Sequence, residues 1–212
     1  MRRLLKRWYR RLRDRRTRRS LVAPTAAERV VLTSTWDFPN PTHGYAYQEM
    51  LGFLARGYDV RVFCGEPRPH NGLAARFRPL LSRTAVVETL RDLHLADRAW
   101  LEREHPGRID AFLARVAAAT GRELTELRDD PLVLRAATFT RLVALTRARY
   151  LQSWFFYDQS FMAMYAAQVL GLPRAISCHV DHVLADHPLK LVPLQLATAD
   201  LVLAISERTR AE

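Results

Sequence analysis

The sequence contains only two cysteines, Cys64 and Cys178, and each of them ends an apolar run. Because small secreted domains depend on several disulfides, this usage favours a reduced, cytoplasmic protein over a disulfide scaffold. No apolar run approaches the roughly 20 residues that a membrane-spanning helix needs. The N-terminus also lacks the apolar segment of a secretory signal peptide. We therefore expect no segment that crosses a bilayer.

Two common nucleotide-binding motifs are missing as well. The chain contains neither the G-x-x-x-x-G-K-[ST] phosphate loop nor the G-x-G-x-x-G dinucleotide fingerprint. Their absence argues against hydrolysis of nucleoside triphosphates and against binding of a nicotinamide cofactor. The chain also shows no internal repeat and no low-complexity tract.

Positive charge is concentrated at the N-terminus. The net charge is +11, and residues 1–20 contain eleven basic residues and one acidic residue. This segment therefore carries +10, and the other 192 residues together carry only +1. A nearly neutral body is unlike a nucleic-acid-binding domain, so we do not expect a nucleic acid as the partner.

The basic segment also has an apolar periodicity. Leu4, Trp8 and Leu12 recur at intervals of four residues, with Leu5 and Tyr9 beside them, so a helix would present a narrow apolar stripe edged by arginines. Such a helix suits the anionic inner face of a membrane, where basic and aromatic side chains both find partners. The alternative is a disordered polycation that contacts RNA without specificity.

The first part of the body has the pattern of a βαβ unit. After a short linker at residues 25–28, a β-rich run at 29–35 leads to a loop with two prolines at 36–44. Apolar residues at helical spacing then predict a helix over 45–56, which Gly57 ends. The alternating run at 58–64 predicts a second strand, parallel to the first.

The rest of the chain resumes this alternation after a helical insertion at about residues 91–150. Within the insertion, charged segments rich in alanine, leucine and arginine predict helices. At 212 residues and 49% apolar content, we expect one α/β domain with a parallel sheet flanked by helices, preceded by the basic helix. The predicted elements after residue 90 are helices at 92–104, 108–119 and 131–150, a strand at 151–156, a helix at 160–170 that Gly171 stops, a strand at 174–178, a helix at 189–197 despite Pro193, and a strand at 201–205.

Four segments carry a resemblance to a known family: residues 41–49, 54–63, 170–179 and 199–207. In their order and spacing they resemble the N-terminal domain of GT-B glycosyltransferases, in particular the glycosyl transferase family 4-like enzymes of bacterial polysaccharide and lipid-linked glycan assembly. The resemblance covers residues 29–212, almost everything after the basic tail and linker at 1–28.

The resemblance implies the Rossmann-like, acceptor-side half of a two-domain enzyme whose C-terminal, donor-binding half is absent from this chain. The reaction would be the transfer of a hexose-type sugar from a nucleotide-sugar to a glycan or lipid-linked acceptor, with retention and without a metal or other cofactor. The protein would act at the cytoplasmic face of the membrane. This chain alone is expected to fold without transferring sugar.

His179 is the expected catalytic residue. It corresponds to the histidine of the family's segment at Ser177–His182, where it would hydrogen-bond a sugar hydroxyl and help to polarise the acceptor. The alternative is a histidine satisfied by the carbonyls of its own turn. At the start of the first helix, Thr42, His43 and Gly44 are expected to contact substrate, because glycine before a helix lets a phosphate or sugar approach the backbone. Gly44 would otherwise serve only to make the turn.

The family's first-helix glutamate is present as Glu49, either as a substrate contact or as an exposed helix carboxylate. The His-x-His run of many relatives is missing from residues 152–158, where Tyr157 or Asp158 would contact substrate instead. Asp181, Ser206 and Glu207 complete the predicted substrate-binding residues, although Ser206 also suits a helix N-cap.

The polar residues after the strand at 174–178 invite a metal-site interpretation, but their spacing matches no standard ligand pattern. We therefore predict no metal site. A function of a different class also stays open, namely a noncatalytic α/β binding module held on a membrane or RNA by its basic tail. The residues that would have formed the metal site are His179, Asp181, His182, Asp186 and His187.

Overall fold

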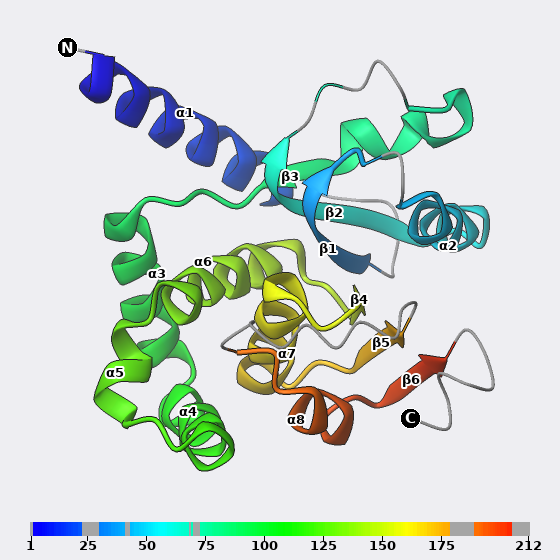
Figure 1. The fold of residues 1–212 in the computed structure, drawn as a ribbon. Coiled ribbons are helices and arrows are strands. Elements are labelled where there is room, and N and C mark those ends of the chain that lie inside the picture. Colours follow the sequence, from blue (N-terminus) through cyan, green and yellow to red (C-terminus); the bar gives the residue numbers. More distant parts are fainter. Residues whose placement is uncertain are drawn as a thin grey trace.

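A parallel sheet forms the centre of the molecule (Figure 1). The computed structural model describes residues 2–22, 30–40, 43–67, 69, 73–178 and 189–204. Among these residues the sheet has six strands in the order β3-β2-β1-β4-β5-β6, and every neighbouring pair is parallel. The predicted α/β class with a parallel sheet is thereby confirmed, and the strand order is compatible with a Rossmann-like fold. The strands are β1 (Val30–Phe38), β2 (Asp59–Pro67), β3 (Thr84–Val86), β4 (Tyr150–Trp154), β5 (Arg174–Cys178) and β6 (Leu201–Ala204).

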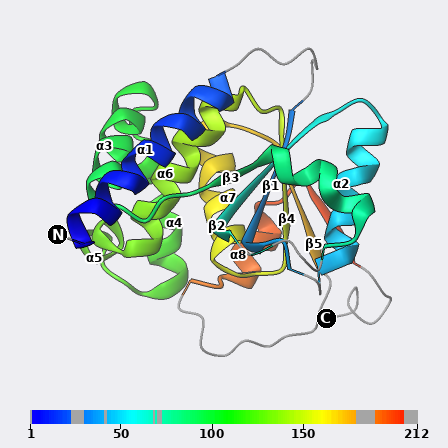
Figure 2. The same cartoon turned by 90° about the horizontal axis from the view of Figure 1, so that it is seen from above.

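Helices cover both faces of the sheet (Figures 1 and 2). On one face, α2 (Gly44–Ala55) and the 3-10 helix η2 (Ala75–Arg83) enclose a core that includes Met50, Val60 and Trp154. On the other face, α6 (Pro131–Thr146) and α7 (Asp158–Leu170) enclose a larger core with Phe139 and Leu151. The remaining helices are α1 (Arg2–Val22), α3 (Arg91–Glu104), α4 (Arg108–Thr120), α5 (Leu124–Asp129) and α8 (Val192–Ala197).

Local sequence signals explain where several helices begin and end. The Asp130 side chain accepts a 2.8 Å hydrogen bond from the Leu132 amide, and Pro131 occupies the first turn, so α6 has a strong N-terminus. Gly171 ends α7 in the left-handed conformation with φ of 68°, as predicted. None of the helices in the described part of the chain is both long and apolar enough to span a membrane.

Several element boundaries differ from the predictions. Strand β1 continues through Trp36, Asp37 and Phe38, which were predicted as loop, because Asp37 and Phe38 pair with Glu66 and Pro67 of β2. The helix predicted over 131–150 ends at Thr146, since the chain turns at Arg147 with φ of 54° and enters β4. The predicted helix at 189–197 begins only at Val192. Elements η2, β3 and α5 were not predicted at all.

Candidate functional site

The site lies at the carboxyl ends of β1 and β4, which are neighbours in the middle of the sheet. From β1 the chain continues through α2 to β2 on one side, and from β4 through α7 to β5 on the other. The connections from β1 and from β4 thus run in opposite directions along the sheet. The gap between the ends of these two strands is the topological switch point, where open α/β sheets bind ligands. Helices α2 and α7 both begin here, and a helix N-terminus favours an anion.

Aromatic side chains from both loops meet at this edge. The ring of Phe155 lies 6.0 Å from that of His43, 6.0 Å from that of Tyr45 and 5.5 Å from that of Tyr157, measured between ring centroids. All four residues are half-buried, so each keeps part of its surface accessible. Burial, with a contribution from Tyr157, raises the pKa of Tyr45 from its ordinary value of 10.0 to about 12. Such rings offer flat apolar surface together with hydrogen-bonding edges.

Phe155 reaches this cluster through an unusual backbone conformation. Its φ is 60°, in the left-handed region that costs a bulky residue on the order of 1–3 kcal/mol. Three hydrogen bonds hold the turn. The Phe155 amide donates to the Ser177 carbonyl at 3.1 Å, and the Ser160 hydroxyl donates to the carbonyls of Trp154 and Phe155. Strain of this kind gathers at functional sites, so Phe155 is a candidate for ligand contact.

Glu49 joins α2 to the ends of β4 and β5. The Trp154 indole donates a 2.6 Å hydrogen bond to its Oε2, and the Ser177 hydroxyl donates to its Oε1 at 3.3 Å. Glu49 is half-buried rather than exposed, so the interpretation as a free surface carboxylate is wrong. Its side chain has a fixed position beside the switch point.

A chain of hydrogen bonds ends on this carboxylate. The Tyr150 hydroxyl donates to Gln152 Oε1 at 2.8 Å, and Gln152 Nε2 donates to the Ser177 hydroxyl at 2.8 Å. Because the Ser177 oxygen accepts from Gln152, its own proton is free to point toward Glu49. Burial, together with the nearby Glu49 charge, raises the pKa of Tyr150 from its ordinary value of 10.0 to about 12. The network therefore orients donors toward Glu49 and leaves its remaining lone pairs for a ligand hydroxyl.

Two further predicted residues lie at the helix starts. Gly44 does not adopt a left-handed φ, and a Cβ at this position would meet no atom within 4 Å. Neither the turn nor the packing therefore requires glycine there. Asp158 lies in the first turn of α7, and its Oδ2 is 4.0 Å from Arg135 Nη1. Both the helix N-terminus and the Arg135 guanidinium therefore stabilise the Asp158 carboxylate.

The structure brings together His43, Gly44 and Glu49 with residues that the sequence interpretation did not assign, chiefly Tyr45 and Phe155. The aromatic run at residues 154–157, at the end of the strand predicted over 151–156, was a usable signal for the latter. Within the described part of the chain, no group of three or more histidine, cysteine, aspartate or glutamate residues could hold a metal ion. Thr42, His179, Asp181, Ser206 and Glu207 lie outside the described residues, as do His182, Asp186 and His187.

Comparison with known proteins adds no assignment. No family model matches the chain, and no curated protein matches it.

Proposed function

We propose that this chain is the acceptor-side half of a GT-B glycosyltransferase that transfers a sugar from a nucleotide-sugar to a glycan or lipid-linked acceptor. The observation that carries the proposal is the arrangement at the switch point, where an oriented carboxylate and an aromatic cluster adjoin two helix N-termini. The resemblance of residues 29–212 to this family agrees with that arrangement.

Each part of the site has a role in this proposal. A sugar ring of the acceptor stacks on Tyr45 and Phe155, and Glu49 accepts a hydrogen bond from one of its hydroxyls. The N-terminus of α2, which has no acidic residue in its first turn, attracts phosphate oxygens, either of a lipid-linked acceptor or of the departing nucleoside diphosphate. His179, which follows the last residue of β5 in the sequence, helps to polarise the attacking hydroxyl.

Binding of acceptors to this chain tests the first half of the proposal. We expect oligosaccharides and soluble analogues of lipid-linked sugars to show saturation transfer in NMR spectra with residues 1–212. Glu49→Gln should weaken this binding about tenfold, because it removes one charge-assisted hydrogen bond. The matched control is Glu104→Gln at the end of α3, an exposed carboxylate away from the site. Equal effects of the two substitutions would contradict the assignment of Glu49.

A transfer assay with labelled nucleotide-sugars tests the second half. Because reaction requires donor and acceptor to be held together, we expect no transfer by this chain alone and transfer once a donor-binding half is supplied. Micromolar binding of a nucleotide-sugar by residues 1–212 alone would refute the division of labour. Acceptor binding without transfer under any condition would favour the noncatalytic binding module.

A further inference from the structure

The first turns of helix α1 present their apolar side away from the protein, whereas Leu12 is half-buried and Leu21 is buried in the core. Leu4, Leu5, Trp8 and Tyr9 are 73%, 59%, 62% and 60% exposed. An amphipathic helix of a globular protein normally buries such a stripe against the core. Here the first turns of α1 project from the body, while the rest of the helix lies beside α6 and β3 (Figures 1 and 2).

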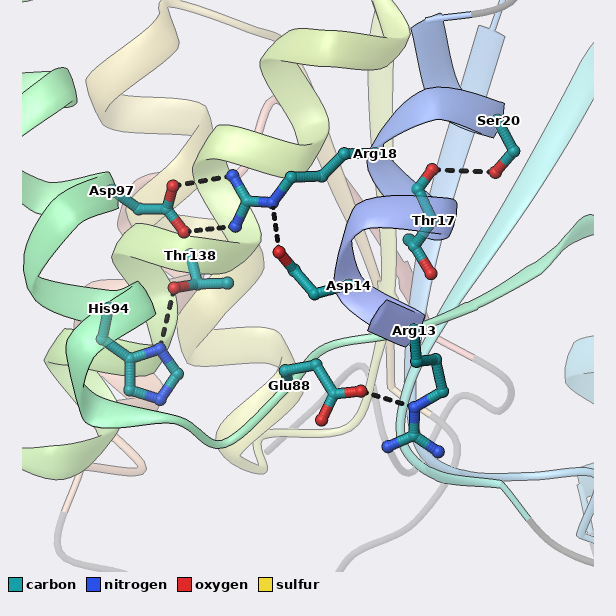
Figure 3. Close-up of polar contacts among 9 residues, drawn as sticks. All are labelled: Arg13, Asp14, Thr17, Arg18, Ser20, Glu88, His94, Asp97 and Thr138. Atoms are coloured by element: carbon teal, nitrogen blue, oxygen red, sulfur yellow. Dashed lines mark hydrogen bonds and ion pairs between the residues drawn. The ribbon is translucent and has the colours of Figure 1, made fainter. Parts of the chain in front are cut away.

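The opposite side of α1 is charged and faces the body. Arg18 donates two hydrogen bonds to Asp97, at 2.7 and 2.8 Å, and a third to Asp14 at 2.7 Å (Figure 3). Arg13 pairs with Glu88, which is almost completely buried. Nearer the N-terminus of α1, Arg7 and Arg11 both form ion pairs with Asp92. Because these carboxylates are buried or multiply paired, they fix the rotation of α1 about its axis.

Helical periodicity separates the two sides. Arg7, Arg11, Asp14 and Arg18 follow one another at intervals of four, three and four residues, which places them along one side of the helix. The exposed apolar residues of the first turns and the exposed arginines of the later turns recur at similar spacing along the other side. We call these residues together the outward face of α1. It comprises Leu4, Leu5, Trp8, Tyr9, Arg15, Arg16 and Arg19.

The arginines of the outward face are exposed. Within the described part of the chain, Arg15, Arg16 and Arg19 form no ion pair or hydrogen bond through their side chains. A groove at the border of the two sides is lined by Leu4 and Trp8 together with Arg7 and Arg11. The outward face thus offers apolar surface and positive charge together.

We propose that the outward face of α1 is a preformed docking surface for an anionic lipid bilayer. Leucines enter the acyl boundary, tryptophan and tyrosine sit at the level of the headgroups, and the arginines meet lipid phosphates. RNA would use the arginines but would gain little from Leu4 and Leu5. A second copy of this face would set the arginines against arginines if packed parallel, or against Leu4 and Trp8 if packed antiparallel, so neither arrangement would pair these charges. The inference does not depend on the proposed glycosyl transfer.

The ion pairs give this surface a property that a flexible tail lacks. Because Arg18 and Arg13 tie α1 to α3 and to the segment before it, the bilayer would hold the whole chain in one orientation. No folding of the segment has to accompany binding, so lipid should leave the helix content of the protein unchanged.

Co-sedimentation with vesicles tests the apolar part of the surface. The full chain should bind phosphatidylcholine vesicles that contain phosphatidylglycerol, and bind pure phosphatidylcholine vesicles far more weakly. Leu4→Ser combined with Trp8→Ser should weaken binding to the anionic vesicles at least about tenfold, because two interfacial side chains are lost. The matched control is Leu124→Ser in α5, another exposed leucine, which should leave binding unchanged.

The charged part is tested separately. Arg15→Gln, Arg16→Gln and Arg19→Gln together should weaken binding about 100-fold, since each basic residue near an anionic surface contributes roughly a fivefold factor. The control replaces three exposed arginines elsewhere, Arg78→Gln, Arg103→Gln and Arg108→Gln. A specific role of the outward face requires the control to lose much less affinity than the test variant.

Any of the following results would overturn the proposal. One is that the full chain binds neutral and anionic vesicles equally well, and a second is an equal loss of binding in the test and control arginine variants. Another is tight RNA binding that the Leu4 and Trp8 substitutions leave intact, without vesicle binding by the parent chain. The last is dimerisation in sedimentation equilibrium that Trp8→Ser abolishes. Since all substituted positions are exposed, circular dichroism should show folded variants, so loss of binding is not loss of structure.

Discussion

Replacing Arg18 by methionine removes the cation that two buried carboxylates share. Asp97 and Asp14 are only 5% and 3% exposed, and Arg18 donates to both. Burial alone would lower the pKa of Arg18, but its hydrogen bonds to Asp97 and Asp14 outweigh burial and raise it. Burial also raises the pKa of Asp14, and the ion pair with Arg18 only partly offsets this. Arg18→Met therefore leaves two carboxylates without compensation.

Removal of one partner from a buried ion pair costs about 3–5 kcal/mol. The Arg18 side chain is 23% exposed, so water screens part of the interaction and we expect the lower end, about 3 kcal/mol. The cost should grow as pH rises from about 4 to 7. In that range Asp14 of the unfolded chain ionises freely, whereas Asp14 of the folded variant, whose pKa burial raises, resists ionisation.

Urea denaturation of matched variants gives the measurement. Arg19→Met is the control, because Arg19 is the next residue, is exposed and should change the free energy of unfolding by no more than about 0.5 kcal/mol. Adding Asp14→Asn and Asp97→Asn to Arg18→Met should recover most of the loss, since no unpaired charge remains buried. If Arg18→Met is as harmless as Arg19→Met, the ion pairs do not hold α1 on the body.

Three further predictions concern other parts of the molecule. His94 is buried against Thr138, and burial, followed by the Arg135 charge, lowers its pKa from 6.5 to about 4. Between pH 6.5 and about 4, His94 is therefore protonated in the unfolded chain but not in the folded chain. The free energy of unfolding should fall by up to roughly 3 kcal/mol as pH drops through this range. Urea titrations at several pH values should show a smaller fall for His94→Asn, and identical slopes would contradict the lowered pKa. Gly44→Ala should leave the melting midpoint nearly unchanged, since a Cβ there meets open space, but should weaken acceptor binding in the NMR assay. Unchanged binding would remove Gly44 from the site. Phe155→Gly should relieve the left-handed strain, offsetting part of the lost packing, yet abolish acceptor binding, and retained affinity in the same titration would show that the ring is dispensable.

The sequence allowed much of the fold to be predicted where the signals are local. Strand β5 was predicted with both its boundaries, because its apolar run follows the Gly171 helix stop and Pro173. Strand β3 was missed, since three residues at 84–86 carry no periodicity and become a strand only by pairing with β2. The helix predicted over 131–150 ran too far because helix-forming residues continue to Tyr150, which pairs with Val31 instead.

The site divides in the same way. The positions of Gly44 at the start of α2 and of Glu49 within α2 could be predicted, because the sequence indicates a helix over 45–56. The partners of Glu49 could not, because Trp154 and Ser177 lie 105 and 128 residues away along the chain. For α1, periodicity predicted the apolar stripe, but which side faces the body depends on acidic residues at 88–97 that only the fold brings close.

The strand order also has a consequence for synthesis of the protein. Strands β1, β2 and β3 lie close together in the sequence. The other edge of β1 pairs with β4, for example Val31 with Tyr150, so this edge stays unpaired until β4 has been synthesised. At ~5–20 residues per second, a ribosome needs roughly 6–24 s to add the residues between them. During this interval β1 has an open edge, and α6 and α7 do not yet cover the sheet. The centre of the sheet therefore closes late, and the nascent chain is most open to chaperones, or to pairing with another chain, before β4 leaves the ribosome.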